Sequence, residues 1–282
     1  MADDIYLSIV IPCKNQAVVA KKTLEDIVEY SKKAKFEMEV LFCDGNSSDN
    51  SAEVAESFRG KIKNLHVFHE SILQRGHHFT GKGAAVKAGM SKASGEIRMF
   101  MDADSSTPIK EIDKLLPYFD KGYDVVMGSR YTSKPLPATN STLRALGKAI
   151  KEVFEVLIYG HSKSNTMIEK QGRIRQLISR GGNLVFVVLL GQGFADTRCG
   201  FKAYTKDAAE TLFALQELPG FGFDTEILVI AKKYKYKIIE VPVEWHNDAE
   251  DSTVTIGDGF KTFNEIFKIK WNNFRGRYNE NR

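Results

Sequence analysis

The sequence lacks long hydrophobic runs. Among its 282 residues the longest uninterrupted apolar run is Leu184–Leu190, far shorter than the ~20 residues of a membrane-spanning helix. The first residues also lack the pattern of a secretory signal, because Asp3 and Asp4 precede a short strand-like segment. These absences predict a cytoplasmic protein that meets a membrane only as a peripheral protein on its cytoplasmic face.

Cysteine is scarce, and neither repeats nor low-complexity tracts are present. Cys13, Cys43 and Cys199 lie in or beside apolar segments at no metal-ligand spacing, which indicates reduced core residues. A content of 43% apolar and 27% charged residues is that of a globular protein. The net charge of +4 favours anionic ligands slightly, and we expect no nucleic acid partner.

Short apolar runs alternate with helical patterns through most of the chain. Such alternation predicts an α/β fold with a mostly parallel sheet flanked by helices. The expected strands are Leu7–Pro12, Met38–Cys43, Leu65–Phe68, Ile97–Met101, Asp124–Met127 and Ile238–Val243.

Two aspartates one residue apart, Asp102 and Asp104, follow the apolar run Ile97–Met101. Thr107 and Pro108 then match the N-cap and first residue of a helix. The pair should lie at the carboxyl end of a strand, where open α/β sheets bind ligands, and could hold a divalent cation with its phosphate ligands. Alone the motif is weak, because aspartate is common in turns.

A glycine-rich segment precedes the aspartate strand. Gly81-Lys82-Gly83 is similar to a phosphate-binding helix start but lacks the full P-loop spacing. The alternative is that these glycines serve only close helix packing.

The pattern changes between residues 131 and 182. Helices are expected over Leu143–Ile158 and Ile174–Leu190, and the second begins among Arg173, Arg175 and Arg180. The simplest interpretation of this segment is a helical insertion that packs on the sheet, with its three arginines in solvent.

The C-terminal segment is aromatic and basic. One helical face carries Phe260, Phe263, Phe267, Trp271 and Phe274, with lysines and arginines among and after them. Such a helix can lie on a membrane surface, but we expect this stripe to pack on its own domain.

Taken together, these segments resemble the family 2 glycosyltransferases with the GT-A fold, particularly the dolichyl- and polyprenyl-phosphate sugar synthases and their glucosyl branch. The resemblance spans nearly the whole chain apart from residues 131–172, and it rests on the order and spacing of several motifs. These are Ser8–Pro12, Asp44-Gly45, Gly81–Val86, Asp102–Asp104, Gly128–Arg130, Asp196–Lys202, Phe223–Glu226 and Val241–Val243.

The resemblance implies a metal-dependent, inverting transfer of a hexose from a nucleotide-diphospho-sugar to a polyprenyl phosphate. Asp102 and Asp104 would hold Mg²⁺ or Mn²⁺ on the diphosphate. The donor would be bound by Pro12, Asn15, Asp44, Lys82, Asp102 and Arg130, with Asp44 on the base. Candidates for the acceptor phosphate are Arg130, Arg173, Arg175 and Arg180, of which Arg180 is the first choice because an apolar run follows it.

Two positions depart from the family pattern. Cys43 stands before Asp44 where a second acid is usual, and Gln16 follows Asn15 where glutamate is usual. Both lie where the nucleoside should bind. UDP-glucose is the favoured donor, with GDP-mannose as the alternative.

Other functions use the same residues differently. A soluble or saccharide hydroxyl acceptor would need a catalytic base, for which Asp196, Asp224 and Glu226 are candidates. A non-catalytic nucleotide-sugar-binding protein would have no reason to keep Asp102 and Asp104. A nucleotidyltransferase would carry a basic glycine-rich loop after the first strand, unlike Cys13–Gln16.

We expect the chain to divide into four parts. A nucleotide-sugar-binding half covers residues 1–130, and a helical insertion that could contact membrane or acceptor covers 131–195. The acceptor-side half of the same domain covers 196–255. A basic amphipathic helix and tail cover 256–282.

Overall fold

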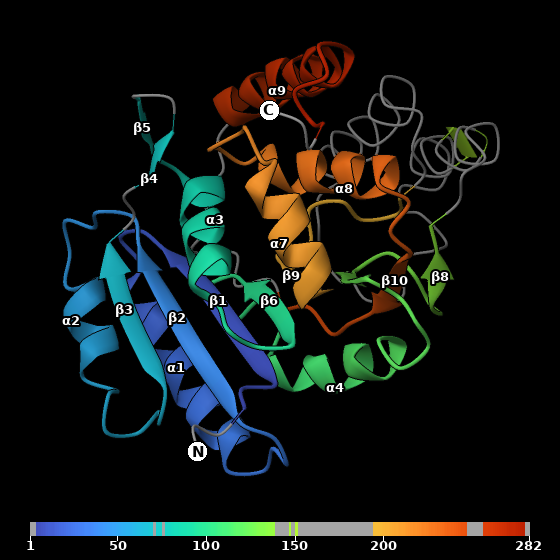
Figure 1. Cartoon of the computed structure of the whole chain (residues 1–282). Coiled ribbons are helices and arrows are strands. Elements are labelled where there is room, and N and C mark those ends of the chain that lie inside the picture. Colours follow the sequence, from blue (N-terminus) through green and yellow to red (C-terminus); the bar gives the residue numbers. More distant parts are fainter. Residues whose placement is uncertain are drawn as a thin grey trace.

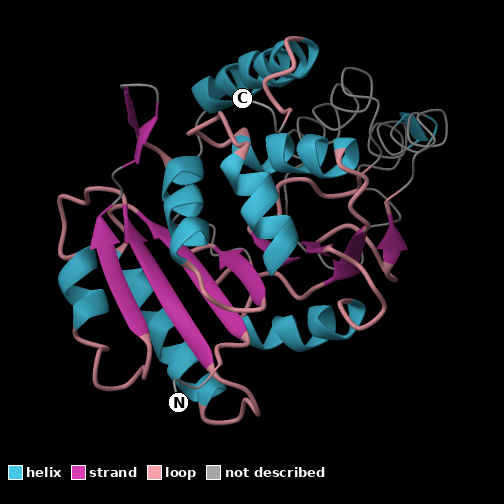
Figure 2. Ribbon diagram, in the orientation of Figure 1, coloured by secondary structure: helices cyan, strands magenta, loops and turns pink. Residues whose placement is uncertain are grey.

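The computed structural model describes residues 4–69, 72–74, 77–138, 147, 150–151, 194–246 and 256–279, with the backbone alone for 72–74, 77–79 and 256–263. Helices and strands alternate, and a central sheet lies between helices (Figure 2). This architecture confirms the predicted α/β class.

An eight-stranded sheet forms the centre, in the order β3-β2-β1-β6-β9-β7-β10-β8. Strands β1, β2, β3 and β6 are parallel, as are β7 and β10. Strand β9 runs antiparallel between β6 and β7, and β8 is antiparallel to β10. A separate hairpin joins β4 and β5. The strands are β1 (Leu7–Cys13), β2 (Met38–Asp44), β3 (Leu65–His69), β4 (Ile72–Gln74), β5 (His77–Phe79), β6 (Ile97–Met101), β7 (Val125–Ser129), β8 (Leu136–Pro137), β9 (Phe201–Thr205) and β10 (Ile238–Pro242).

Helices cover both faces of the sheet (Figure 1). One face packs against α1, α2 and the segment around α4, and the other against α3, α7 and α8. The helical elements are α1 (Ala17–Ser31), α2 (Ser51–Glu56), α3 (Lys82–Lys92), η1 (Ile109–Glu111), α4 (Ile112–Leu115), η2 (Leu116–Tyr118), α7 (Lys206–Ala214), α8 (Phe223–Lys233) and α9 (Ile256–Phe274).

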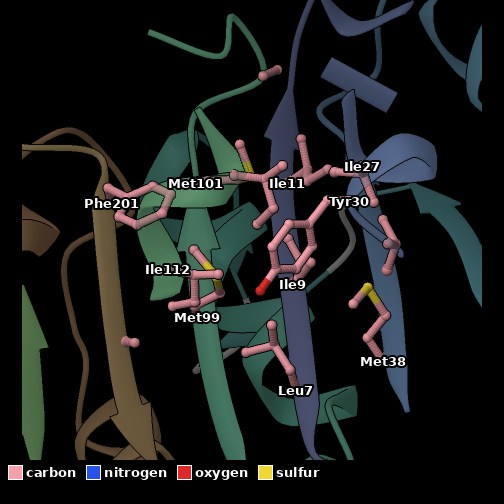
Figure 3. Packing of buried hydrophobic residues seen from close by; sticks show 14 of the residues in the cluster. Leu7, Ile9, Ile11, Ile27, Tyr30, Met38, Met99, Met101, Ile112 and Phe201 are labelled. Carbon is pink, nitrogen blue, oxygen red and sulfur yellow. The ribbon is translucent and has the colours of Figure 1, made fainter. Parts of the chain in front are cut away.

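The central strand β1 shows why these strands read as continuous apolar runs. Leu7, Ile9 and Ile11 pack on one face with Ile27 of α1 (Figure 3), whereas Val10 belongs to the core on the other face. A strand buried on both faces has no polar side to alternate with. Each such side chain contributes about 1.5–3 kcal/mol on burial, so β1 is a rigid base for the loop that follows it.

The helix expected after the aspartates is present but broken. Pro108 is extended, with φ −60° and ψ 144°, so the helical residues begin at Ile109 rather than at Pro108. Pro117 lies in the first turn of η2. Proline has no N–H to give to a continuing α-helix, so Pro117 separates α4 from η2.

Helix α9 differs from the expectation in its packing. Ile266 and Ile269 are buried, whereas Phe267, Trp271 and Phe274 are 49%, 53% and 83% exposed. The prediction that the aromatic stripe packs on its own domain is therefore wrong for these three residues.

Part of the predicted insertion lies outside the described residues. This applies to Arg173, Arg175 and Arg180, and to the two helices expected between residues 143 and 190, apart from 147 and 150–151, which are helical. In the part of the chain that the structure describes, no helix combines the length and the apolar character required to cross a bilayer.

Candidate active site

Most predicted site residues lie along one edge of the sheet, where the parallel strands end. Asp44 ends β2, Asp102 directly follows β6, and Arg130 directly follows β7. Because β9 is antiparallel to its neighbours, the segment before it, which contains Asp196, reaches the same edge. Ligands of open α/β sheets bind in this position.

Lys82 and Asp102 form an ion pair at this edge. The Nζ–Oδ1 distance is 2.5 Å, and Lys82 is the first residue of α3, after Gly81. Burial opposes the charge on Lys82, but the carboxylates of Asp102 and Asp224 outweigh it and raise the pKa of Lys82. A charged ammonium at a helix N-terminus is suited to a phosphate group.

Asp104 lies beside this pair. Its Oδ1 accepts a hydrogen bond from Ser106 N at 2.9 Å, and burial together with the charge of Asp102 raises the pKa of Asp104. A carboxylate whose charge is disfavoured in this way is stabilised by a cation. Among the described residues no group of three or more acidic, histidine or cysteine side chains could hold a metal. The aspartate pair fits a cation that takes its other ligands from substrate phosphates, as Mg²⁺ commonly does.

Gly200 packs directly against the carboxylate of Asp102. A Cβ atom at Gly200 would lie 2.1 Å from Oδ2 and 2.3 Å from Cγ of Asp102. The backbone N–H of Asp102 also donates to the carbonyl of Gly200 at 3.1 Å. This close approach requires a residue without a side chain, so the segment before β9 fixes the position of Asp102.

Asp44 is buried at the end of β2. Its Oδ2 accepts a hydrogen bond from Ser47 N at 3.1 Å and lies 2.9 Å from His69 Nδ1. Its Oδ1 is buried and has no hydrogen-bond partner among the described residues. An unpaired buried acceptor is costly, so this oxygen is suited to an N–H group of a ligand.

Asn15 joins the loops that follow β1 and β2. It adopts a left-handed φ of 52°, its N–H donates to Ser47 Oγ at 2.9 Å, and its Oδ1 accepts from Ser48 N at 2.7 Å. Pro12 is buried in β1 opposite Cys43 of β2. Both residues shape the wall beside Asp44, and their contact with a nucleoside stays a prediction.

Arg130 and Asp196 form a bidentate ion pair. The Nε–Oδ2 and Nη2–Oδ1 distances are 2.8 and 2.9 Å, and the guanidinium lies 5.2 and 5.3 Å from the ring centroids of Tyr131 and Trp245. Burial opposes the charge on Asp196, but Arg130 outweighs it and lowers the pKa of Asp196. Asp196, predicted as a catalytic base, is thus ionised and paired with Arg130, which was predicted to bind phosphate.

Asp224, another predicted base, is also held in an ion pair, with Lys202. Lys202 Nζ donates to Asp224 Oδ1 at 2.5 Å and also to the carbonyls of Thr197 and Cys199 at 3.0 and 2.8 Å. Burial raises the pKa of Asp224, and the charges of Lys202 and Lys82 oppose that rise. The buried lysine ties the segment before β9 to the start of α8.

Glu226 has different neighbours from the other candidates. Its carboxylate accepts hydrogen bonds from Leu218 N, Glu217 N and the Tyr278 hydroxyl at 2.8, 3.1 and 2.7 Å. Burial raises the pKa of Glu226 to about 7. These contacts join the loop before α8 to the C-terminal segment, and none of them is made to Lys82, Asp102 or Asp104.

Arg198 is a candidate that the sequence interpretation missed. It is exposed, and its guanidinium has no ion-pair or hydrogen-bond partner among the described residues. The signal in the sequence was its place inside the Asp196–Lys202 motif, between two residues of the site.

Comparison with known families decides the class of protein. Residues 8–212 match the model of Glycosyl transferase family 2, which is well over half of the chain. The chain belongs to glycosyl transferase family 2. The predicted enzyme class, a glycosyltransferase, is thereby confirmed.

Relatives in this family match over most of the chain. A dolichyl-phosphate beta-glucosyltransferase of Trichomonas vaginalis is 28% identical, with coverage of 94% of this chain and 73% of the relative. The enzyme of the same description from Saccharomyces cerevisiae is 24% identical and covers 99% of this chain and 78% of its own. The predicted resemblance to this branch is confirmed.

Solved glycosyltransferase structures share the fold. Mannosyl-3-phosphoglycerate synthase from Rubrobacter xylanophilus has a TM-score of 0.62 at 17% identity, covering 99% of this chain and 77% of that one. Glucosyl-3-phosphoglycerate synthase from Mycobacterium tuberculosis, in complex with Mn²⁺, UDP and glucosyl-3-phosphoglycerate, has a TM-score of 0.56 at 15% identity, covering 95% and 80%. The GT-A fold of this family 2 glycosyltransferase is as predicted.

Proposed function

We propose that this enzyme transfers a hexose, with glucose favoured, from a nucleoside-diphosphate sugar to the phosphate of a polyprenyl phosphate of the dolichyl type. The observation that carries the proposal is the sheet edge itself, where Asp102, Asp104 and Lys82 offer a diphosphate site. Arg198 offers a guanidinium for a second phosphate, and this group has no partner among the described residues. The relatives described as dolichyl-phosphate beta-glucosyltransferases support the choice of acceptor.

The donor would be held at both ends of its nucleotide. Asp102 and Asp104 would hold Mg²⁺ or Mn²⁺, which neutralises charge on the departing diphosphate. Lys82 would contact the same diphosphate. Asp44 would accept a ring N–H of the base through Oδ1, the buried oxygen without a partner. Structural neighbours solved with UDP, Mn²⁺ and UDP-glucose support a uridine donor.

The reaction would be a single displacement. An oxygen of the acceptor phosphate forms a bond to C1 of the sugar, while the bond from C1 to the diphosphate oxygen breaks and its electron pair leaves with the nucleoside diphosphate. Nucleotide glucose carries an α linkage, so a β product, as in the relatives' descriptions, requires inversion.

A phosphate acceptor is consistent with the ion pairs of Asp196 and Asp224, because such an acceptor needs no catalytic base. The second pKa of a phosphate monoester is about 6, so its oxygen is already ionised near neutral pH and needs positioning rather than a base. Asp196 and Asp224 are paired with Arg130 and Lys202, which suits them to positioning. A hydroxyl acceptor would instead require one of them to take a proton.

The function is tested by incubating the protein with UDP-glucose or GDP-mannose, Mg²⁺ or Mn²⁺, and either undecaprenyl phosphate or dolichyl phosphate. Free glucose and 3-phosphoglycerate serve as soluble acceptors in parallel. We expect labelled sugar in the lipid phase with UDP-glucose. Label on a soluble acceptor alone would replace the lipid acceptor by the hydroxyl alternative.

The donor contact predicts a defect in binding. Asp44→Asn should weaken UDP-glucose binding about 10- to 100-fold, because a hydrogen bond to a charged acceptor contributes roughly 1.5–3 kcal/mol. Calorimetry on Asp120→Asn, an exposed aspartate near the opposite edge of the sheet, provides the control. Unchanged affinity in Asp44→Asn, or binding of GDP-mannose in place of UDP-glucose, would contradict the assignment.

The acceptor contact predicts a different pattern. Arg198→Ala should raise the KM for polyprenyl phosphate roughly 10- to 100-fold while leaving the Kd for UDP unchanged, because a charged hydrogen bond to phosphate is lost. Arg198→Lys should recover only part of the loss, since lysine lacks the planar fork. Arg59→Ala, which removes an exposed arginine paired with Glu56, is the control. An equal loss of UDP affinity would assign Arg198 to the donor instead.

A further inference from the structure

Helix α9 has an exposed face that the candidate active site does not use. Phe267, Trp271 and Phe274 follow one another at spacings of four and three residues, so they share a face of the helix. They are 49%, 53% and 83% exposed, whereas Ile266 and Ile269 are buried on the other side. The rings of Trp271 and Phe274 stack at 6.1 Å. Contiguous exposed aromatic side chains mark an interaction surface.

Positive charge borders these aromatic residues. Lys268 and Lys270 are exposed and have no ion-pair partner in the described part of the chain, and Arg275 lies 4.6 Å from the ring of Trp271. Between residues 264 and 279 Glu265 is the single acidic residue, and its carboxylate lies against Gly220 and Gly222. Between residues 264 and 279 the exposed face is therefore aromatic and cationic, with no acidic side chain on it.

The opposite side of α9 contacts the loop before α8, and this loop reaches the candidate active site. A Cβ atom at Gly220 or Gly222 would lie 2.6 or 2.7 Å from a carboxylate oxygen of Glu265, so α9 contacts this loop directly. Phe221, between the two glycines, is 57% exposed, and its ring centroid lies 5.9 Å from Lys82 Nζ. Figure 1 shows α9 at the end of the molecule toward which the arrows of β2 and β3 point.

We propose that α9 binds the surface of an anionic lipid bilayer through Phe267, Trp271, Phe274, Lys268 and Lys270, here called the α9 aromatic face. Tryptophan and phenylalanine favour the boundary between headgroups and acyl chains, and basic residues are attracted to anionic headgroups. A bilayer fits this surface better than a protein groove would, because the surface carries charge of one sign and the helix contacts a loop of the site. The choice of a bilayer as the partner of α9 rests on the proposed function, in which the acceptor is a lipid. That lipid would then enter the site beside Phe221.

The proposal is tested by co-sedimentation of the full chain with vesicles of mixed phosphatidylcholine and phosphatidylserine, and with vesicles of phosphatidylcholine alone. Lys268→Ala/Lys270→Ala should lower the partition coefficient on anionic vesicles roughly 30-fold, at about 1 kcal/mol for each basic residue. Trp271→Ala/Phe274→Ala should lower it at least as much, and high salt should release the wild type. Val18→Ala, which removes an 86% exposed side chain of α1, is the control.

Activity on a short, water-soluble isoprenyl phosphate separates this proposal from the proposed function. Both double variants should retain wild-type turnover with that acceptor and lose turnover when the acceptor is embedded in vesicles. Failure of all forms to use the soluble isoprenyl phosphate would overturn the proposed function. Equal vesicle binding by wild type and both double variants, or dimerisation in solution that Trp271→Ala/Phe274→Ala abolishes without any vesicle binding, would overturn the docking surface.

Discussion

Asp104→Ala is expected to reduce transfer by at least roughly a thousandfold while the protein stays folded. The variant removes one of two carboxylates that would hold the divalent cation, and neutralising the leaving diphosphate is worth several kcal/mol, of which a thousandfold is about 4 kcal/mol. Stability should fall by only about 1 kcal/mol, since the side chain accepts a hydrogen bond from Ser106 N at a partly exposed position.

The measurement is kcat/KM with Mg²⁺ or Mn²⁺, combined with calorimetry of UDP binding with and without the metal. Asp102→Asn should behave alike, and both variants should lose the metal-dependent part of UDP affinity. Asp120→Ala, at an exposed turn, should match the wild type. Near-normal transfer by Asp104→Ala in chelator-treated buffer would remove the aspartate pair from the metal role.

Gly200→Ala is expected to reduce transfer about 100- to 1,000-fold although it adds only a methyl group. The new Cβ would occupy the place of the Asp102 carboxylate, 2.1 Å from Oδ2, so this side chain must turn away from the cation position. A displacement of catalytic groups by about 1 Å can cost on the order of 100-fold. Because a side chain rather than the backbone must yield, the free energy of unfolding should fall by only about 1–3 kcal/mol.

Gly60→Ala is the matched control, because a Cβ at Gly60 has nothing within 4 Å. Both glycine variants are compared in kcat/KM, in UDP affinity with metal present, and in denaturant unfolding. Wild-type turnover in Gly200→Ala would show that the position of Asp102 against the segment before β9 is not required. A large loss of stability would show instead that this segment is part of the structural core.

The strand ends were predictable, because local sequence determines them. The apolar run Ile97–Met101 became β6, and it placed Asp102 and Asp104 at the expected edge. The helix start at Lys82 was equally local, and Asp44, predicted in the turn after the strand, is the last residue of β2. Each depends on residues only a few positions away, so periodicity and turn chemistry suffice.

The partners of the charged residues were not predictable. Arg130 and Asp196 are 66 positions apart, and they meet because β9 enters the sheet in reverse between β6 and β7. Glu226 was a candidate base by residue type, yet its carboxylate is bound to two loop amides and Tyr278. The exposure of the α9 aromatic face also depends on tertiary packing, since the same stripe would suit a buried helix.

The reversed strand β9 has a consequence for synthesis of the chain. It completes one side of β6, which ends at Met101, yet β9 begins only at Phe201. At about 5–20 residues per second, roughly 100 residues take on the order of 5–20 s to emerge. During that interval the buried strand β6 has an unpaired edge, the kind of edge that invites wrong association. A chain that stops before β9 is therefore left with an open edge in the middle of its sheet, rather than with a finished donor-binding half.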